Sequence, residues 1–348
     1  MTSRPAAFAI PGDINRRTGG YIYERRLLEG LRAEGRRVEH IVLPSSFPDP
    51  SPAEMAASIA TMAALPAECP LIVDGLVFGS ADPEGYRTIG APTIAMLHHP
   101  LGLETGLAPD WAAELLRREK ANLEHARHVV VPSPHTARIL VSQFAVPEQK
   151  ISIALPGFDP RPAAPRRPAD PPLILSVGLM ARRKGHDVLV KALAQITDLG
   201  WQAEIVGGPH EQAVEDELRD QIGALGLAGR VHLRGFLSDA EVADCYGRAS
   251  IFALATRYEG YGIVFGEAMV NGLPIVTCAT GAVPETVAPE AGLLVPVDDD
   301  EAFADALRAL LCDPQRAAAM AQASAAAGEA LPGWQDTAAV MSRVLDRV

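Results

Sequence analysis

Short apolar runs alternate with longer segments of helical periodicity along the whole chain. An apolar run of a few residues bounded by turn residues favours a buried strand, and the longer segments between the runs favour helices. Regular alternation of strands and helices predicts parallel sheets with helices on both faces. The expected fold class is therefore α/β.

The expected strands of the first half are Ala7–Ile10, Val38–Leu43, Leu71–Val73, Thr93–Leu97, His128–Val131 and Ile151–Leu155. Those of the second half are Leu173–Val177, Ala203–Val206, Val231–Leu233, Ser250–Leu254, Pro274–Thr277 and Leu293–Val295. Expected helices include Tyr21–Glu34, Asp110–His125, His186–Ile196 and Glu211–Leu225.

A proline-rich stretch divides the chain into two halves. Residues 159–172 contain six prolines among fourteen residues, a composition typical of an extended, semi-rigid linker. We expect a first domain over residues 1–160, a linker over 161–172 and a second domain over 173–333. The alanine-rich tail is expected to be helical, with its last helix, 334–348, packed back on the first domain. Ligands of such sheets bind beyond the carboxyl ends of the strands, so two facing domains would form a deep cleft.

Charge and hydropathy exclude several classes of protein. The net charge is −12 and there is no basic stripe, so we expect neither nucleic-acid binding nor general attraction to anionic lipid. No apolar stretch reaches 18 residues, and residues 1–10 lack the pattern of a secretory signal. We expect a cytoplasmic protein with at most peripheral membrane contact.

Two glutamates eight positions apart, Glu259 and Glu267, flank a glycine-rich turn between an apolar run and a helical segment. The turn and the start of the helix are formed by Gly260, Tyr261, Gly262, Ile263 and Val264. Backbone N–H groups at a helix N-terminus bind anions, whereas carboxylates accept hydrogen bonds from neutral hydroxyls. A ligand with phosphate between two hydroxylated ends, such as a nucleotide sugar, fits this layout.

Three consecutive cations, Arg182, Arg183 and Lys184, follow the first expected strand of the second half and its Gly178. Cations at a helix start are unfavourable for the helix dipole, so a bound anion is a reasonable explanation of their position. Arginine offers a planar fork for phosphate and lysine a point charge.

Two motifs in the first half suggest a second set of ligand contacts. Gly19 and Gly20 open a helix after the first strand, where paired glycines allow close approach of the backbone to a ligand. His98 and His99 follow the fourth strand, where an imidazole can hydrogen-bond a substrate or move a proton. Adjacent side chains point to opposite sides, so we expect only one of the two histidines to face the ligand.

Other catalytic patterns are missing from the sequence. The chain has no G-x-G-x-x-G, no G-x-x-x-x-G-K-[ST], no HxxxH and no HExxH. Dinucleotide oxidoreduction, P-loop hydrolysis and a metal site therefore lack their usual sequence support.

Together these motifs resemble the GT-B glycosyltransferases, specifically the large retaining family named glycosyltransferases group 1 (family 4). The matching elements, in chain order, are Gly19-Gly20, Pro156-Gly157-Phe158-Asp159, Val177-Gly178…Lys184-Gly185, Val231-His232-Leu233-Arg234-Gly235, Glu259 to Glu267 and residues 280–285. The similarity covers almost the whole chain. It implies two Rossmann-like domains, doubly wound around parallel sheets, that face each other across a cleft.

The resemblance also implies roles for the matching residues. On the donor side, Glu267 would hold the ribose hydroxyls, Glu259 the hydroxyls of the transferred sugar, and Lys184 with the backbone of residues 262–264 the diphosphate. The base would be framed by Gly235, Phe236 and Leu237. His98 would lie by the sugar and the acceptor, with His99 as the alternative, and Gly19 and Gly20 would line the acceptor side. The catalytic residues implied are Glu259, Lys184 and His98.

The sequence departs from the family at Leu179, where the family usually has arginine. Arg182 or Arg183 would replace that cation. Since Arg183 directly precedes Lys184, their side chains are expected to diverge, and this favours Arg182.

The implied reaction moves a sugar from a nucleoside-diphosphate sugar to an acceptor hydroxyl with retention of anomeric configuration, without a metal or other cofactor. The acceptor would be a glycan, a lipid-linked molecule or a small molecule. Two alternatives remain open: a non-hydrolysing sugar-nucleotide epimerase, and a non-catalytic nucleotide-sugar-binding protein. The sequence determines neither the donor base and sugar nor the acceptor and the oligomeric state.

Overall fold

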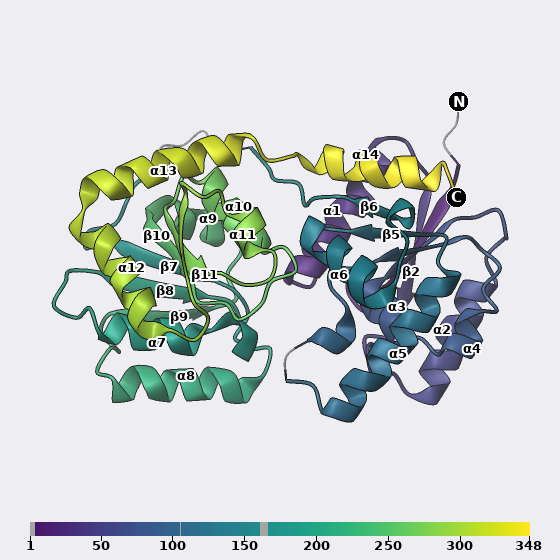
Figure 1. Ribbon diagram of the computed structural model, residues 1–348, viewed down its shortest axis with the longest axis horizontal. Helices are drawn as coiled ribbons and strands as arrows, with labels where there is room; N and C mark the ends of the chain where they lie inside the picture. Colours follow the sequence, from purple (N-terminus) through teal and green to yellow (C-terminus); the bar gives the residue numbers. More distant parts are fainter. Residues whose placement is uncertain (1–3, 105, 161–165) are drawn as a thin grey trace. The chain divides into compact units, whose positions relative to one another are not determined.

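Each half of the chain forms a sheet of six parallel strands. These sheets are seen in a computed structural model that describes residues 4–104, 106–160 and 166–348. The chain divides into two units: Met1–Gly157 with Pro332–Val348, and Phe158–Leu331. Figure 1 shows each sheet with its surrounding helices. The predicted α/β fold class with two doubly wound parallel sheets is confirmed.

The first unit contains β1 (Ala6–Pro11), β2 (Val38–Leu43), β3 (Leu71–Asp74), β4 (Thr93–Met96), β5 (His128–Val131) and β6 (Ile151–Ile153), in the spatial order β2-β1-β3-β4-β5-β6. Its helices are α1 (Gly19–Ala33), α2 (Pro52–Ala63), α3 (Gly75–Ser80), α4 (Pro83–Tyr86), α5 (Pro109–His125), α6 (Pro134–Phe144) and α14 (Trp334–Leu345), with short 3-10 turns η1 (Leu101–Leu103) and η2 (Glu148–Lys150).

The second unit contains β7 (Leu173–Val177), β8 (Gln202–Val206), β9 (Val231–Gly235), β10 (Ala249–Leu254), β11 (Ile275–Cys278) and β12 (Gly292–Val295), in the order β12-β11-β10-β7-β8-β9. Its helical segments are η3 (Arg182–Lys184), α7 (His186–Ala194), α8 (Gln212–Ala224), α9 (Asp239–Arg248), α10 (Ile263–Val270), α11 (Val283–Thr286), α12 (Asp300–Cys312) and α13 (Pro314–Glu329).

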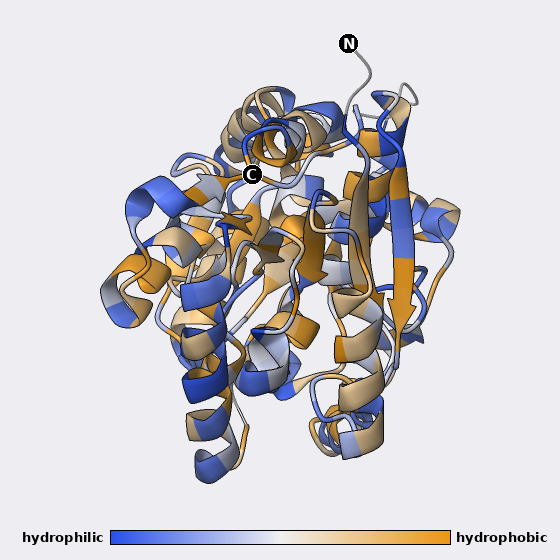
Figure 2. Ribbon diagram, turned by 90° about the vertical axis from the view of Figure 1, so that its right-hand side faces the viewer, coloured by the Kyte–Doolittle hydropathy of each residue, from blue (hydrophilic) through white to orange (hydrophobic). Residues whose placement is uncertain are grey.

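The strands are apolar on both faces because helices cover both faces of each sheet. In β7, Ile174 belongs to a core with side chains of α7, α8 and α12, whereas Leu173 and Leu175 belong to a second core with α9 and α10. Figure 2 shows the same distribution, with apolar residues concentrated on the inner strands and hydrophilic residues on the outer helices. Continuous apolar runs, rather than alternating ones, are therefore the pattern that these strands require.

The last helix, α14, belongs to the first unit, where it packs along α1 (Figure 1). Gly30 allows this close approach, since a Cβ added there would lie 2.7 Å from the Cβ of Ala338. The hydroxyl of Thr337 donates a hydrogen bond to the carbonyl of Leu155 at 2.7 Å, and Nη2 of the buried Arg36 lies 2.6 Å from Oδ1 of Asp346. Backbone, apolar and ionic contacts thus all attach α14 to the first unit.

The expected linker lies against the second unit where the structure describes it. The backbone N–H groups of Arg167 and Ala169 donate to the carbonyls of Gly247 and Arg248, at 2.9 Å each. Phe158 also belongs to this unit, with its ring stacked on that of Tyr261 at a centroid distance of 6.4 Å. Residues 161–165 of the expected linker lie outside the described residues.

Each sheet has one point where the strand order reverses, between β1 and β3 in the first unit and between β7 and β10 in the second. In open α/β sheets, ligands bind beyond the carboxyl ends of the strands at such a point. The loops after β7 and β10 carry the cations and glutamates singled out in the sequence. The corresponding loops of the first unit carry Gly19 and Gly20 after β1 and Asp74 at the end of β3.

Candidate functional site

Glu259 lies in the loop between β10 and α10, and its carboxylate is buried among cations. Its Oε1 accepts hydrogen bonds from Nζ of Lys184 at 2.5 Å and from the hydroxyl of Thr256 at 3.1 Å. Its Oε2 lies 3.7 Å from Nη1 of Arg183. Burial raises the pKa of Glu259, but the charges of Lys184 and Arg183 outweigh burial and hold the pKa below its usual value. The carboxylate is therefore ionised and paired.

Glycines bring the two loops together. Gly185 has φ of 62°, and a Cβ there would lie 1.8 Å from the carbonyl oxygen of Ala255, so the turn after Lys184 lies directly on the end of β10. Gly178 lies against the stem of Lys184, with its ideal Cβ position 3.3 Å from Cδ of that side chain. Close packing of backbone thus directs Lys184 toward Glu259.

The divergence expected for Arg183 and Lys184 does not occur, because both side chains approach the same carboxylate. Residues 182–184 form the 3-10 turn η3, in which successive side chains are about 120° apart rather than opposite. Arg182 is the residue that points elsewhere: its Nη2 lies 2.9 Å from Oε1 of Glu217 on α8, and both side chains are more than half exposed. Arg183 is the arginine that lies beside Lys184.

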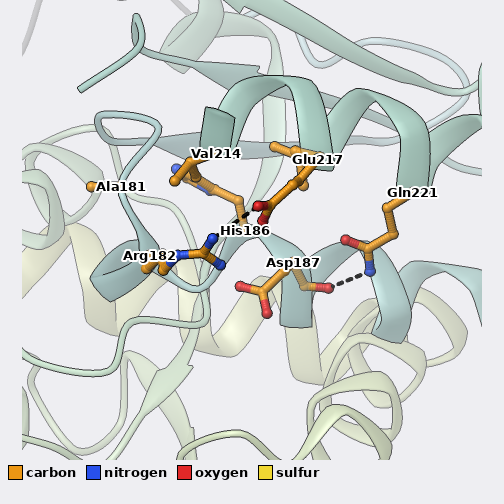
Figure 3. Close-up of a pocket in the computed structure, with 8 residues that line it drawn as sticks. Ala181, Arg182, His186, Asp187, Val214, Glu217 and Gln221 are labelled. Atoms are coloured by element: carbon orange, nitrogen blue, oxygen red, sulfur yellow. Dashed lines mark hydrogen bonds and ion pairs between the residues drawn. The ribbon is translucent and has the colours of Figure 1, made fainter. Parts of the chain in front are cut away.

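Figure 3 shows the pocket into which Arg182 extends. It is lined by Ala181, Arg182, His186, Asp187, Val214, Glu217, Leu218 and Gln221 and encloses about 100 Å³. Arg182 pairs with Glu217, and the amide of Gln221 donates to the carbonyl of Asp187 at 2.9 Å. Since ligand pockets usually enclose about 300 Å³ or more, this pocket is too small for a nucleotide sugar.

The helix after the glycine-rich turn begins at Ile263, as predicted. Its N-cap is Gly262, with φ of 87°, which lacks a side chain that could cap the first-turn N–H groups. Ile263 and Val264 are only partly buried. Gly260 and Tyr261 precede the cap, and Tyr261 is buried against Phe158. The start of α10 thus has the backbone arrangement that binds anions.

Glu267 lies about one turn inside α10, where its Oε2 accepts a hydrogen bond from the hydroxyl of Tyr246 on α9 at 2.7 Å. Burial raises its pKa, and the bond from Tyr246 opposes that rise only in part. The two glutamates of the motif therefore differ: Glu259 is ionised by contact with cations, whereas Glu267 has no cation among the groups that shift its pKa.

The segment expected to frame a base follows β9. Gly235 has φ of 62°, Leu237 packs against the α9–α10 core, and Phe236 is 57% exposed. The ring of Phe236 lies against Gly208, where a Cβ would be 2.0 Å from the ring. An exposed aromatic face held by a glycine offers a surface for a flat ring.

In the first unit, His98 lies against the paired glycines. A Cβ on Gly20 would lie 3.4 Å from Cδ2 of His98, and the rings of Tyr23 and His98 meet edge to face with centroids 5.2 Å apart. The hydroxyl of Thr136 donates to the carbonyl of His98 at 3.2 Å. His99 instead pairs with Glu104, with Nε2 and Oε2 2.7 Å apart. Gly19 begins α1 after the N-cap Thr18.

Four side chains in these regions were not predicted from the sequence: Thr256, Tyr246, Glu24 and Asp74. Thr256 and Tyr246 bond the two glutamates of the motif. Asp74 ends the apolar run of β3, and Glu24 lies one helical turn before the buried Leu27 and Leu28. The spacing of Glu24 from these leucines places it on the apolar face of α1, a signal that was available in the sequence.

Neither a bilayer-spanning helix nor a metal cluster is found within the part of the chain that the structure describes. No described helix is both long and apolar enough to cross a membrane. Likewise, the described residues contain no group of three or more His, Cys, Asp or Glu side chains arranged to hold a metal ion.

Two doubly wound parallel sheets, one with a cation and glutamate cluster at its switch point, define the GT-B class of fold. Residues 159–326 match the family model described as glycosyl transferases group 1. A D-inositol 3-phosphate glycosyltransferase of Kineococcus radiotolerans is 30% identical over 273 residues, which cover 70% of this chain and 62% of that protein. Residues 159–326, which make up most of the second unit, therefore belong to the glycosyl transferases group 1 family.

Solved structures give the same result for the fold. Sucrose-phosphate synthase from Thermosynechococcus elongatus has a TM-score of 0.85 at 25% identity and covers 99% of this chain and 98% of its own. Anabaena HepE, solved with UDP and glucose, has a TM-score of 0.78 at 18% identity and covers 99% and 100%. The curated relatives are longer, and the chain spans only about three-fifths of the first of them.

Proposed function

We propose that this chain is a glycosyltransferase that moves a sugar from a nucleoside-diphosphate sugar to an acceptor hydroxyl with retention of configuration, and that it needs no metal ion. The observation that carries the proposal is the cluster of Arg183, Lys184 and Glu259 at the switch point of the second sheet. The match of residues 159–326 to the family model and the close structural likeness to a sucrose-phosphate synthase support it.

In this proposal the second unit binds the donor. The ammonium of Lys184, the guanidinium of Arg183 and the N–H groups at the start of α10 hold the diphosphate, and Glu259 accepts hydrogen bonds from the sugar. Glu267, held by Tyr246, accepts bonds from the ribose, and the segment from Gly235 to Leu237 frames the base. His98 and the paired glycines Gly19 and Gly20 belong to the acceptor side in the first unit.

The chemical role of the cations follows from the reaction. Cleavage of the glycosidic C–O bond places negative charge on the departing phosphate, and fixed donors aimed at that oxygen stabilise the charge as it develops. Removing one such donor typically costs about 3 kcal/mol of transition-state stabilisation. A proton leaves the acceptor hydroxyl for the departing phosphate, so the reaction is balanced without a protein nucleophile.

The first test is a thermal-shift screen of UDP-, GDP-, ADP- and TDP-sugars. A ligand at 100 times its Kd stabilises the folded state by about 2.7 kcal/mol, which gives a clear rise in Tm. The donor found in this way is then incubated with inositol phosphates and hexose phosphates, acceptor classes suggested by the names of the relatives. Release of nucleoside diphosphate that depends on acceptor supports the proposal. Conversion of the donor without acceptor would indicate an epimerase, and binding without turnover a binding protein.

A further inference from the structure

A pair of buried carboxyl groups lies behind His98 in the first unit. Glu24, on α1, is 1% exposed, and Asp74, at the end of β3, is 5% exposed. Their side chains are hydrogen-bonded to each other. Burial raises the pKa of Glu24 to about 7 and, with the nearby charge of Glu24, raises the pKa of Asp74 well above its usual value. Two carboxyl groups in contact inside a core do not both ionise readily, so near neutral pH at least one of them keeps its proton.

Asp74 has a second set of contacts. Its Oδ1 accepts hydrogen bonds from the backbone N–H groups of Leu76 at 2.8 Å and Val77 at 3.3 Å, and so caps the short helix α3. These donors stabilise negative charge on Asp74. The pair can therefore place its charge on Asp74, at the helix cap, or on Glu24, closer to the imidazole.

The geometry connects this pair to His98. Nε2 of His98 lies 3.8 Å from Oε1 of Glu24. Both atoms are buried, and neither has a hydrogen-bond partner among the residues that the structure describes. The His98 side chain is 26% exposed, whereas that of Glu24 is 1% exposed. A small rotation of the ring would close the gap to hydrogen-bond length, and catalytic hydrogen bonds are often long in structures without substrate.

Within the described chain, the charged groups that shift the pKa values of Glu24, Asp74 and His98 are these three residues themselves. From α1, the hydroxyl of Tyr21 donates to the carbonyl of Pro11 and that of Tyr23 to the carbonyl of Ala154. The guanidinium of Arg16 lies 5.7 Å from the centre of the Tyr21 ring. Burial lowers the pKa of His98 and the charge of Asp74 opposes this, so His98 is neutral at physiological pH.

We infer that Glu24 is a positioning residue for His98: with Asp74 it forms one proton-sharing chain that accepts the Nε2–H of a neutral imidazole. This tautomer leaves Nδ1 as the acceptor of the ring, able to take a hydrogen bond from a hydroxyl of the acceptor substrate. The inference rests on the proposed function only for that last step. The chain of Asp74, Glu24 and His98 lies within the first unit and can be tested without a substrate.

The test uses NMR of protein labelled with ¹⁵N-histidine, in which His98 is assigned by its loss in His98→Gln. The tautomer and the titration midpoint of His98 are measured in the parent, Glu24→Gln and Asp74→Asn. Glu24→Gln removes the carboxylate that lies 3.8 Å from Nε2 of His98, so the midpoint falls. Asp74→Asn keeps an oxygen that caps α3 but removes the charge that raises the pKa of His98, so the midpoint also falls. Each shift is expected to be about one pH unit, a tenfold change in proton affinity.

A midpoint that rises, or that stays within about 0.3 unit of the parent, in either variant overturns the inference. A parent His98 with the proton on Nδ1 also overturns it. If Asp74→Asn does not fold, the result for Glu24→Gln alone decides, since glutamine is nearly isosteric with glutamate. Thermal shifts with UDP and GDP are recorded on the same samples. If the parent protein binds neither nucleotide, this counts against the proposed function but leaves the result for His98 unchanged.

Discussion

Nζ of Lys184 donates a 2.5 Å hydrogen bond to Oε1 of Glu259, and both side chains are almost fully buried. The two residues come from different βα loops, after β7 and β10, which meet where the strand order of the second sheet reverses. A buried ion pair needs further bonds to offset desolvation, and Thr256 and Arg183 supply them. In the proposed reaction Lys184 holds the diphosphate of the donor and Glu259 the hydroxyls of the transferred sugar.

The pair should couple strongly in a double-mutant cycle. Lys184→Met leaves Glu259 buried with a more distant cation, and removing one partner of a buried pair typically costs about 3 kcal/mol. The double variant with Glu259→Gln should lose less than the sum of the two single losses, measured by urea unfolding. The matched control is Arg182→Gln, which breaks an exposed pair with Glu217 and should change the unfolding free energy by at most about 0.5 kcal/mol. Strict additivity at Lys184 and Glu259 would contradict the coupling.

We expect Arg183, but not the adjacent Arg182, to contribute to nucleotide binding. Arg183→Gln should weaken the Kd for the nucleoside diphosphate at least tenfold, because its guanidinium approaches Glu259 beside Lys184. Arg182→Gln should change that Kd less than twofold, since Arg182 pairs with α8. Isothermal titration of both variants measures the two Kd values. An equal loss of affinity in both would show that the arginines are arranged differently when the nucleotide is bound.

Glu267 and Lys184 should each be required for turnover. Alanine at either position is expected to lower kcat/KM at least tenfold while circular dichroism stays that of the parent. Tyr246→Phe removes the hydroxyl that bonds Glu267 but leaves the carboxylate, so a smaller loss is expected, mainly in the KM for donor. Turnover within twofold of the parent in Glu267→Ala or Lys184→Ala would refute the roles given to them.

Gly281 should not tolerate a side chain, because its backbone supports the loop of Glu259. It has φ of 54°, and a Cβ there would lie 2.3 Å from the carbonyl oxygen of Glu259. Gly281→Ala is expected to destabilise the protein by about 2 kcal/mol or more and to weaken donor binding. Gly200→Ala is the control, since nothing lies within 4 Å of its Cβ position. A Tm for Gly281→Ala equal to that of the control would disprove this account.

Glu119 predicts a pH dependence of stability in the first unit. It is fully buried on α5, and burial raises its pKa from 4.5 to about 8, with only the N–H of Leu101 opposing. A carboxyl group with a raised pKa stabilises the folded state fully below pH 4.5, and this contribution is lost as pH rises toward 8. Glu119→Gln does not titrate. The unfolding free energy of the variant minus that of the parent should therefore increase with pH, by up to about 1.4 kcal/mol per unit.

Urea unfolding of both proteins at pH 5, 6.5 and 8 measures this difference. A difference that stays constant across the three pH values would mean that Glu119 does not titrate in this range.

The sequence predicted the sheets well, because parallel strands covered on both faces leave a simple trace, a short run of apolar residues. The start of α10 at Ile263 was also predictable, since glycines mark the turn before it. The order of the strands could not be predicted, because the sequence does not show that β10 lies beside β7.

The sequence named most residues of the candidate site but did not show which of them pair with one another. Arg183, rather than Arg182, approaches Glu259 because residues 182–184 form the 3-10 turn η3. Three consecutive cations in the sequence do not predict such a turn. Similarly, the spacing of Glu24 from Leu27 and Leu28 indicates that it lies on the apolar face of α1, but not that Asp74 and His98 lie beside it. Contacts between residues distant in sequence require the tertiary structure, even where each residue type was noted.

The packing of α14 on α1 has a consequence for synthesis on the ribosome. The second unit is complete once residue 331 has emerged and can form while the chain is still growing. The first unit, although it begins first, acquires α14 only after the whole second unit has been made. Until then the side of α1 that receives Ala338 stays uncovered.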